Sequence, residues 1–290
     1  MMRLSAGVLC VALSLSACAQ DGPAAVAAKP GAKAKAPATT PKAIEPFIRS
    51  GTPEARARDA IRRINDQVTI EWVGPAPFPG FRQLVVGGQV VYVSDDGKYL
   101  MQGQVFDTLT DTNIGDAPMN AVRRKLLATV PKADRIVFSP PNPKYTVSVF
   151  TDVECGFCRK FHSEIGEINR QGIAVEYLAF PRMGLGSDDF RKMVSVWCSA
   201  DRRRALTDAK SDRAVKSVDC KNPVTMQYDV GRRAGLTGTP MILAPDGTAL
   251  GGYLPPAKLR AALDQLAAGK AVGRSTATEP ASGQGGAGSR

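Results

Sequence analysis

The sequence predicts an α+β fold, with a small N-terminal domain, a linker helix and a larger C-terminal α/β domain that carries a helical insert. In residues 51–110, one helix pattern is followed by several short strand patterns. In residues 133–269, strand and helix patterns alternate, which is typical of α/β domains. The chain has 290 residues, 43% of them hydrophobic, which is sufficient for two globular cores.

Residues 1–19 have the pattern of a signal peptide for export. Arg3 gives this segment its positive charge, and a short apolar run follows. Two processing routes fit the next residues. Residues 15–18 match a bacterial lipobox, in which Cys18 becomes lipidated, and residues 17–19 match the A-x-A pattern of ordinary cleavage. We favour lipidation, and by either route we expect a periplasmic protein, anchored through Cys18 in the first case.

Two low-complexity segments flank the predicted domains. Residues 20–50 are rich in Ala, Pro and Lys, and residues 270–290 are rich in Gly, Ser and Ala. Such segments bury too little apolar area to offset the entropy lost on ordering. We expect both to be disordered, the first as a tether and the second as a tail.

The N-terminal domain begins with a helix signal. Thr52 is a suitable N-cap, and Pro53 follows at the first helical position. The helix would place Ala57, Ala60, Ile61 and Ile64 on one face. Strand patterns then follow at residues 68–73, 82–86, 89–94 and 98–102.

Turn signals separate these strands. Gly87-Gly88 predicts a tight hairpin turn, and Asp95-Asp96-Gly97 predicts the turn that follows. So small a unit has little core of its own, which favours pairing with a second copy of the chain.

Residues 111–132 are expected to form the linker helix between the domains. Met119, Val122 and Leu126 recur at helical spacing, and Pro131 ends the pattern.

The C-terminal domain starts with a buried strand. Residues 145–150 form a near-continuous run of apolar and β-branched side chains, typical of a strand covered on both faces. The further elements are a helix at 155–170, a strand at 174–180, a mainly helical insert at 187–233, strands at 239–243 and 249–253, and a helix at 255–266. This order of elements is thioredoxin-like.

The motif Cys155-Gly156-Phe157-Cys158 lies between the buried strand and the helix. Cys155 would fall in the first turn, where unpaired N–H groups and the helix dipole favour an anion and lower the pKa of a thiol. Cys158 would lie one turn further on the same side, close enough to form a disulfide. The motif therefore predicts thiol–disulfide chemistry with Cys155 and Cys158 as catalytic residues.

Two other uses of this motif are a purely structural disulfide and half of a zinc site. Further ligands would have to come from Cys198, Cys220 or the single histidine, His162, and the chain has no second C-x-x-C. We therefore expect no metal and no cofactor, and we expect His162 to be a solvated helix residue.

The net charge of +11 does not indicate a nucleic-acid partner. The basic residues are scattered among acidic ones, and the run at residues 202–204 is typical of a solvated helix face. We expect no nucleic acid to bind.

Four of the six cysteines, Cys155, Cys158, Cys198 and Cys220, lie outside the signal peptide. An even number in an exported chain favours two disulfides. Four cysteines allow three pairings, and spacing alone does not choose among them.

Five stretches of the chain resemble the DsbC family of periplasmic disulfide isomerases. They are residues 91–100, 151–160, 177–182, 196–198 and 238–240. Together they run through both domains in order, and the stretch at 151–160 contains the C-x-x-C motif. The chain departs from the family at Phe157, where members often have Tyr, and at Arg159, where they often have His.

The resemblance implies an architecture and a set of roles. Residues 51–110 would be a cystatin-like dimerisation domain, and residues 133–269 a thioredoxin-like catalytic domain. The implied site residues are Cys155 as the attacking cysteine, Cys158 as the resolving cysteine, Thr239 and a cis Pro240 as the substrate-binding residues, and Cys198–Cys220 as a structural disulfide.

The function implied is that of an isomerase that reshuffles incorrect disulfides in misfolded exported proteins. The protein would act as a homodimer and be kept reduced by a DsbD-type membrane reductase. Two alternatives remain open. One is a DsbG-like reductase or thiol protector, although Gly156 stands where that relative has proline. The other is a periplasmic chaperone without catalytic turnover.

Overall fold

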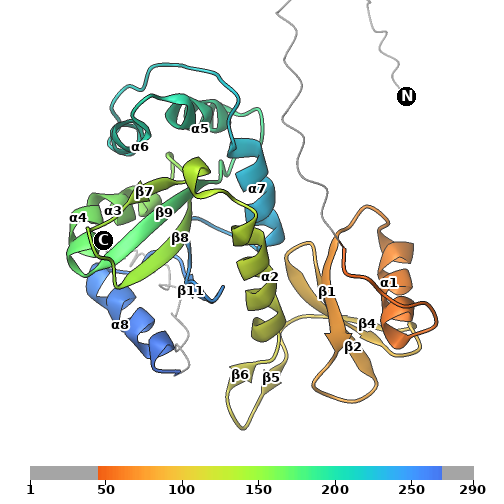
Figure 1. Ribbon diagram of the computed structural model, residues 1–290. Helices are drawn as coiled ribbons and strands as arrows, with labels where there is room; N and C mark the ends of the chain where they lie inside the picture. The colour runs from red at the N-terminus through yellow and green to blue at the C-terminus, as the bar shows by residue number, and fades with distance from the viewer. Residues whose placement is uncertain (1–44, 270–290) are drawn as a thin grey trace, which may run out of the picture. The chain divides into compact units, whose positions relative to one another are not determined.

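The computed structural model describes residues 45–269, which form an α+β structure as predicted (Figure 1). The proposed signal peptide with Cys18, the tail at 270–290 and most of the tether lie outside the described residues. No helix within residues 45–269 combines the length and the apolar character that crossing a bilayer requires.

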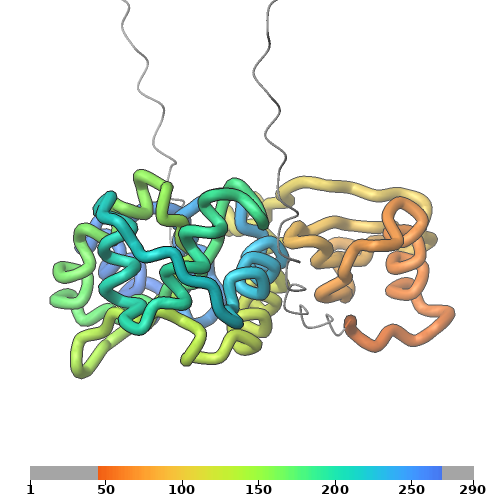
Figure 2. Tube along the Cα trace, turned by 90° about the horizontal axis from the view of Figure 1, so that it is seen from above, coloured from red at the N-terminus to blue at the C-terminus, as the bar shows by residue number. Residues whose placement is uncertain are grey.

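The N-terminal domain is a four-stranded antiparallel sheet with one helix. Its elements are α1 (Pro53–Ile64), β1 (Ile70–Pro75), β2 (Phe81–Val86), β3 (Gln89–Ser94) and β4 (Leu100–Gln102), and the strands pair in the order β1-β2-β3-β4. Helix α1 lies against the sheet in both views (Figures 1 and 2). Ala57 and Ile61 of this helix share a buried cluster with Leu84 and Val91 of the sheet.

Local sequence signals correctly predicted the start of α1 and the turn between β2 and β3. The Thr52 hydroxyl accepts a hydrogen bond from the Ala55 N–H at 3.2 Å and so caps α1, as predicted. Gly87 and Gly88 have φ angles of +55° and +81°, which the tight turn between β2 and β3 requires. One expectation was wrong: Ile64 is 68% exposed, because it is the last residue of α1 and lies beyond the part of the helix that the sheet covers.

A short hairpin and a helix connect the two domains. The hairpin is formed by β5 (Phe106–Asp107) and β6 (Thr112–Asn113), and it was not predicted because its strands have only two residues each. Helix α2 (Asp116–Ala128) is shorter than the predicted 111–132. Its buried side chains include Met119, Val122 and Leu126, as the spacing indicated.

The C-terminal domain has a five-stranded mixed sheet. Its elements are η1 (Lys132–Asp134), β7 (Ile136–Phe138), β8 (Tyr145–Thr151), α3 (Gly156–Ser163), α4 (Ile165–Arg170), β9 (Ile173–Ala179), α5 (Asp188–Cys198), α6 (Arg202–Lys210), α7 (Val224–Arg233), β10 (Met241–Leu243), β11 (Ala249–Gly251) and α8 (Pro256–Ala267). The strand order is β11-β10-β8-β9-β7, with β8 and β9 parallel and the other pairs antiparallel.

Helices cover both faces of this sheet (Figure 1). Successive side chains of a strand point to opposite faces. Val149 and Tyr177 therefore pack on one face with Phe161 of α3 and with helices α4 and α8. Phe150 and Leu178 pack on the other face with α2 and α7. The two central strands are buried on both sides, as the apolar run in β8 predicted.

Three details of this domain differ from the prediction. The helix expected at 155–170 is two helices, because the chain bends at Glu164, whose φ and ψ are −99° and 10°. Residues 211–223 of the insert are not helical. Strand β7 was missed, since three residues carry too little pattern to identify an edge strand.

Candidate active site

The C-x-x-C motif lies where β8 passes into α3. Cys155 is the N-cap of α3, one position earlier than predicted, and its extended backbone (φ −83°, ψ 120°) ends the preceding turn. The Cys158 N–H donates a hydrogen bond to Cys155 Sγ at 3.4 Å. A sulfur in this position receives an N–H donor that the helix itself leaves unpaired. The helix start is therefore suited to a thiolate.

A second loop lies against the Cys155 sulfur. Thr239 precedes strand β10, and its carbonyl oxygen is 3.2 Å from Cys155 Sγ. The peptide bond between Thr239 and Pro240 is cis. The fold thus brings the Thr239-Pro240 pair, which lies more than eighty positions further along the chain, next to the C-x-x-C motif.

The surroundings of Cys155 stabilise its ionised form. A hydrogen bond from the Cys158 side chain is the largest of the effects that lower the pKa of Cys155 to about 5. The hydrogen bond from the Cys158 backbone N–H and the positive charge of Arg182 act in the same direction, and burial opposes them. Cys155 is therefore a thiolate at neutral pH, the form that attacks disulfides.

Cys158 has the opposite environment. It is 1% exposed, and burial, followed by its hydrogen bond to Cys155, raises the pKa of Cys158 far above the ordinary value for a thiol. The two cysteines therefore differ in reactivity, with Cys155 ionised and Cys158 protonated. Such a pair can attack a disulfide with the first sulfur and later close on it with the second.

The turn before Cys155 is held by a buried carboxylate. Asp152 accepts hydrogen bonds from the Glu154 N–H at 2.7 Å, from the Arg182 N–H at 3.0 Å and from Arg182 Nε at 2.8 Å. Asp152 is fully buried, so these donors are needed to compensate its charge. The ion pair also keeps the Arg182 guanidinium near Cys155, where its charge helps to lower the pKa of that thiol.

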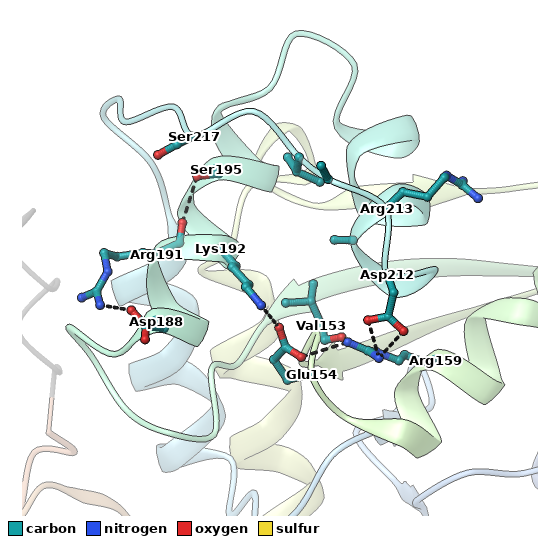
Figure 3. Close-up of a pocket in the computed structure, with 13 residues that line it drawn as sticks. Val153, Glu154, Arg159, Asp188, Arg191, Lys192, Ser195, Asp212, Arg213 and Ser217 are labelled. Carbon is teal, nitrogen blue, oxygen red and sulfur yellow. Dashed lines mark hydrogen bonds and ion pairs between the residues drawn. The ribbon is translucent and has the colours of Figure 1, made fainter.

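A cavity of about 620 Å³ lies beside the motif and is lined by ion pairs. Figure 3 shows Arg159 between Glu154 and Asp212, and Lys192 of α5 reaching the same glutamate. Two cations therefore balance the carboxylate of Glu154, the residue directly before Cys155. This pairing limits the opposition of Glu154 to thiolate formation. It includes Arg159, one of the two positions at which the sequence differs from the pattern that it resembles.

The expectation that His162 is solvated was wrong. It is 4% exposed, with Nδ1 3.1 Å from the Tyr177 hydroxyl and Nε2 2.9 Å from the Thr207 hydroxyl. Burial, with a contribution from the charge of Lys210, lowers the pKa of His162 to about 3. The histidine is buried because α6 of the insert covers this side of α3, a contact that the pattern within α3 cannot show.

No sequence pattern predicted a role for two buried ionisable residues that lie near the motif. Lys210 ends α6, and its Nζ lies 2.7 Å from the Thr151 hydroxyl. Asp189 lies in α5, where burial and the neighbouring charge of Asp152 raise its pKa to about 7. Both residues belong to helices of the insert, and no local pattern distinguishes them from solvated charges.

The remaining two site cysteines are bonded to each other. Cys198 at the end of α5 and Cys220 form a disulfide with a Cα–Cα distance of 5.7 Å and a separation of 22 residues in the chain. Closing a loop of this length stabilises a fold by roughly 3 kcal/mol. The bond ties the irregular end of the insert to α5, while Cys155 and Cys158 are both free.

Two protein-family models match the chain, one in each of the two domains described above. A family model described as a thioredoxin-like domain matches residues 132–267. A second model, described as the N-terminal domain of the disulfide bond isomerase protein, matches residues 48–116.

Several whole proteins of similar sequence are named thiol:disulfide interchange protein DsbC. The thiol:disulfide interchange protein DsbC of Escherichia coli strain K12 is 35% identical over 195 residues, which are 67% of this chain and 80% of that protein. DsbC of Haemophilus influenzae is 36% identical over 192 residues, 66% of this chain and 82% of that protein. A solved structure of a disulfide interchange protein from Neisseria gonorrhoeae is 30% identical, with a TM-score of 0.43, and covers 47% of this chain and 97% of its own.

Proposed function

The chain belongs to the DsbC family of thiol:disulfide interchange proteins, and on that premise we propose that it is an isomerase of incorrect disulfides in exported proteins. As a member of this family it is a thiol–disulfide oxidoreductase with a thioredoxin-like domain. The observation that carries the proposal is the contrast within the pair: Cys155 is ionised at neutral pH, and Cys158 is protonated and buried.

The proposed reaction begins with Cys155. Its thiolate attacks one sulfur of a wrong disulfide, a mixed disulfide forms, and the other substrate sulfur leaves as a thiolate. A different substrate thiolate then attacks the mixed disulfide and forms a new substrate disulfide, which returns Cys155 to its thiolate form. When no substrate thiol attacks, Cys158 closes on Cys155 and the substrate leaves reduced.

Binding of the substrate backbone is assigned to Thr239 and Pro240. Proline has no N–H to pair with the protein, and the Thr239 carbonyl already lies beside the reacting sulfur. Apolar side chains near the motif provide a surface for unfolded segments. Phe157 is 63% exposed and stacks on Tyr253, with ring centroids 6.4 Å apart. This exposed aromatic surface also favours the second candidate function, a chaperone that holds unfolded chains.

The family membership supports the remaining proposals on organisation. Residues 51–110 are proposed as the dimerisation domain, 111–132 as the linker and 133–269 as the catalytic domain. Strand β4 is at the edge of its sheet, and all three of its side chains are exposed, which suits pairing with a second copy. Leu100 and Met101 of this strand are the apolar side chains available for the contact.

The cellular setting is proposed on the same basis. The protein would be periplasmic, and a DsbD-type membrane reductase would return the oxidised Cys155–Cys158 pair to the dithiol. Anchoring through a lipid on Cys18 is part of this proposal. The intact mass of the exported protein distinguishes a lipid-modified Cys18 from cleavage after Ala19.

Scrambled ribonuclease, which carries random disulfides, tests the proposed activity. The reduced protein is expected to restore ribonuclease activity, and the Cys155→Ala variant is expected to give only the rate of the buffer. Wild-type protein with an oxidised Cys155–Cys158 pair is the matched control, because it has the same fold but lacks the thiolate. Normal recovery with Cys155→Ala would refute the isomerase assignment.

A further inference from the structure

Lys210 is a lysine in the interior of the catalytic domain. It is 5% exposed, at the end of α6, and its Nζ donates to the Thr151 hydroxyl at 2.7 Å and to the Asp152 carbonyl at 3.2 Å. These two partners are the last residue of β8 and the first residue of the turn that leads to Cys155. A buried ammonium loses much of its hydration, so an anion or a strong set of acceptors is needed nearby.

The hydrogen-bond partners of Lys210 are neutral oxygens, and the backbone of one of them, Asp152, also hydrogen-bonds the Cys158 thiol, which links the ammonium to the redox pair. Burial lowers the pKa of Lys210 to about 8, and nearby negative charges, including those of Asp152 and Cys155, oppose that effect. The other groups around it are the cationic Arg159, the neutral His162 and the ring of Tyr177, whose centroid is 5.8 Å from Nζ.

Lys210 also acts on Cys158 in return. Burial and the hydrogen bond to Cys155 keep the Cys158 thiol protonated, and the charge of Lys210 is the largest effect that favours its thiolate. Once Cys155 is tied up in a mixed disulfide, it is no longer an anion. Cys158 is then the sulfur beside Lys210 that can ionise.

We propose that Lys210 is a positioning residue for the resolving step, in which its ammonium stabilises the thiolate of Cys158. This inference rests on the proposed roles of Cys155 and Cys158. In the step, Cys158 loses its proton to solvent and its thiolate attacks Cys155 Sγ. The Cys155–Cys158 bond forms, the bond from Cys155 to the substrate sulfur breaks, and the substrate thiolate takes a proton from solvent. The two cysteines are oxidised and the substrate is reduced.

Glutathione disulfide is a suitable probe, because it forms a mixed disulfide with Cys155 that only Cys158 can resolve within the protein. Acid quenching and mass measurement give the rates of formation and of release for wild type and for Lys210→Met. A neighbouring charge changes a pKa by about 1–3 pH units. If Lys210→Met raises the pKa of Cys158 by about two pH units, the fraction of Cys158 present as thiolate falls about 100-fold. The higher pKa also makes that thiolate about tenfold more nucleophilic, so release should slow about tenfold. Formation should change less, since Cys155 is ionised mainly through other groups.

Two variants separate charge from structure. Lys210→Arg keeps a positive charge at this position, so release should stay closer to that of wild type than it does in Lys210→Met. Lys258→Met changes an exposed lysine on α8 and should alter neither rate. If Lys210→Arg slows release as much as Lys210→Met, the role is structural and the inference is wrong.

The wild-type protein provides a test that needs no substitution. Release should accelerate as pH rises and level off no higher than about pH 8, because Lys210 then loses its charge and the mixed disulfide removes the Cys155 anion that helps to keep it protonated. Acceleration that continues through pH 9, or equal release rates in wild type and Lys210→Met, would overturn the inference. If wild type forms no mixed disulfide at all, the proposed function fails instead.

Discussion

Replacing Cys158 with serine is expected to leave the protein covalently attached to its substrates. The variant keeps the Cys155 sulfur at the start of α3 but loses the second thiol, which in the wild type lies within hydrogen-bond distance of the first. An intramolecular thiol reacts as though it were present at very high concentration, so its removal should lengthen the life of the mixed disulfide more than about 100-fold. Mass measurement after mixing with glutathione disulfide detects the adduct.

The matched control for this experiment is Cys155→Ser. It removes the ionised sulfur and leaves Cys158, which is buried and protonated and should form no adduct at neutral pH. Similar adduct yields from the two single variants would mean that the roles of the two cysteines are not distinct. The assignment of an attacking and a resolving cysteine would then be wrong.

Replacing Trp197 with alanine is expected to lower the free energy of unfolding by about 3–5 kcal/mol. Trp197 lies in α5, is fully buried among the side chains of the largest core cluster, and its Nε1 donates to the Asp134 carbonyl at 2.9 Å. Alanine would leave a cavity and remove one of the two hydrogen bonds that the Asp134 carbonyl accepts, the other coming from Gln227 Nε2 at 2.8 Å. Urea unfolding followed by circular dichroism measures the change.

Trp197→Phe tests which part of the side chain matters. It keeps most of the apolar contact and loses the hydrogen bond, so it should cost only about 1–2 kcal/mol. A loss below about 1 kcal/mol for the alanine variant would show that α5 contributes little to the core. Trp197 directly precedes Cys198, whose disulfide to Cys220 holds the end of the insert. The loss measured for Trp197→Ala therefore reports how strongly the insert is attached to the core.

Features with a local cause could be predicted from the sequence. Thr52 and Pro53 define the start of α1, and two glycines define the turn between β2 and β3, because capping and turn geometry depend on a few adjacent residues. The C-x-x-C motif likewise indicated its own position at a helix start. The resemblance to the DsbC family, drawn from five stretches, is confirmed by the comparisons.

Features that depend on distant contacts could not be predicted. His162 was expected in solvent, yet α6 covers it and Thr207 binds its ring. Lys210 lies 59 positions from Thr151, its nearest hydrogen-bond partner, and no pattern within α6 marks it as buried. Sequence periodicity describes which face of a helix is apolar, but not which polar side chains a neighbouring helix will cover.

The central claim, that Cys155 is a thiolate at neutral pH, is tested most directly by following the ultraviolet absorbance of the thiolate in the reduced protein as pH changes. The signal should appear with a midpoint near pH 5, and the rate of attack on glutathione disulfide should rise through the same midpoint and then stay constant, because Cys158 remains protonated. A single midpoint near the ordinary thiol value of 9.0 would contradict the account.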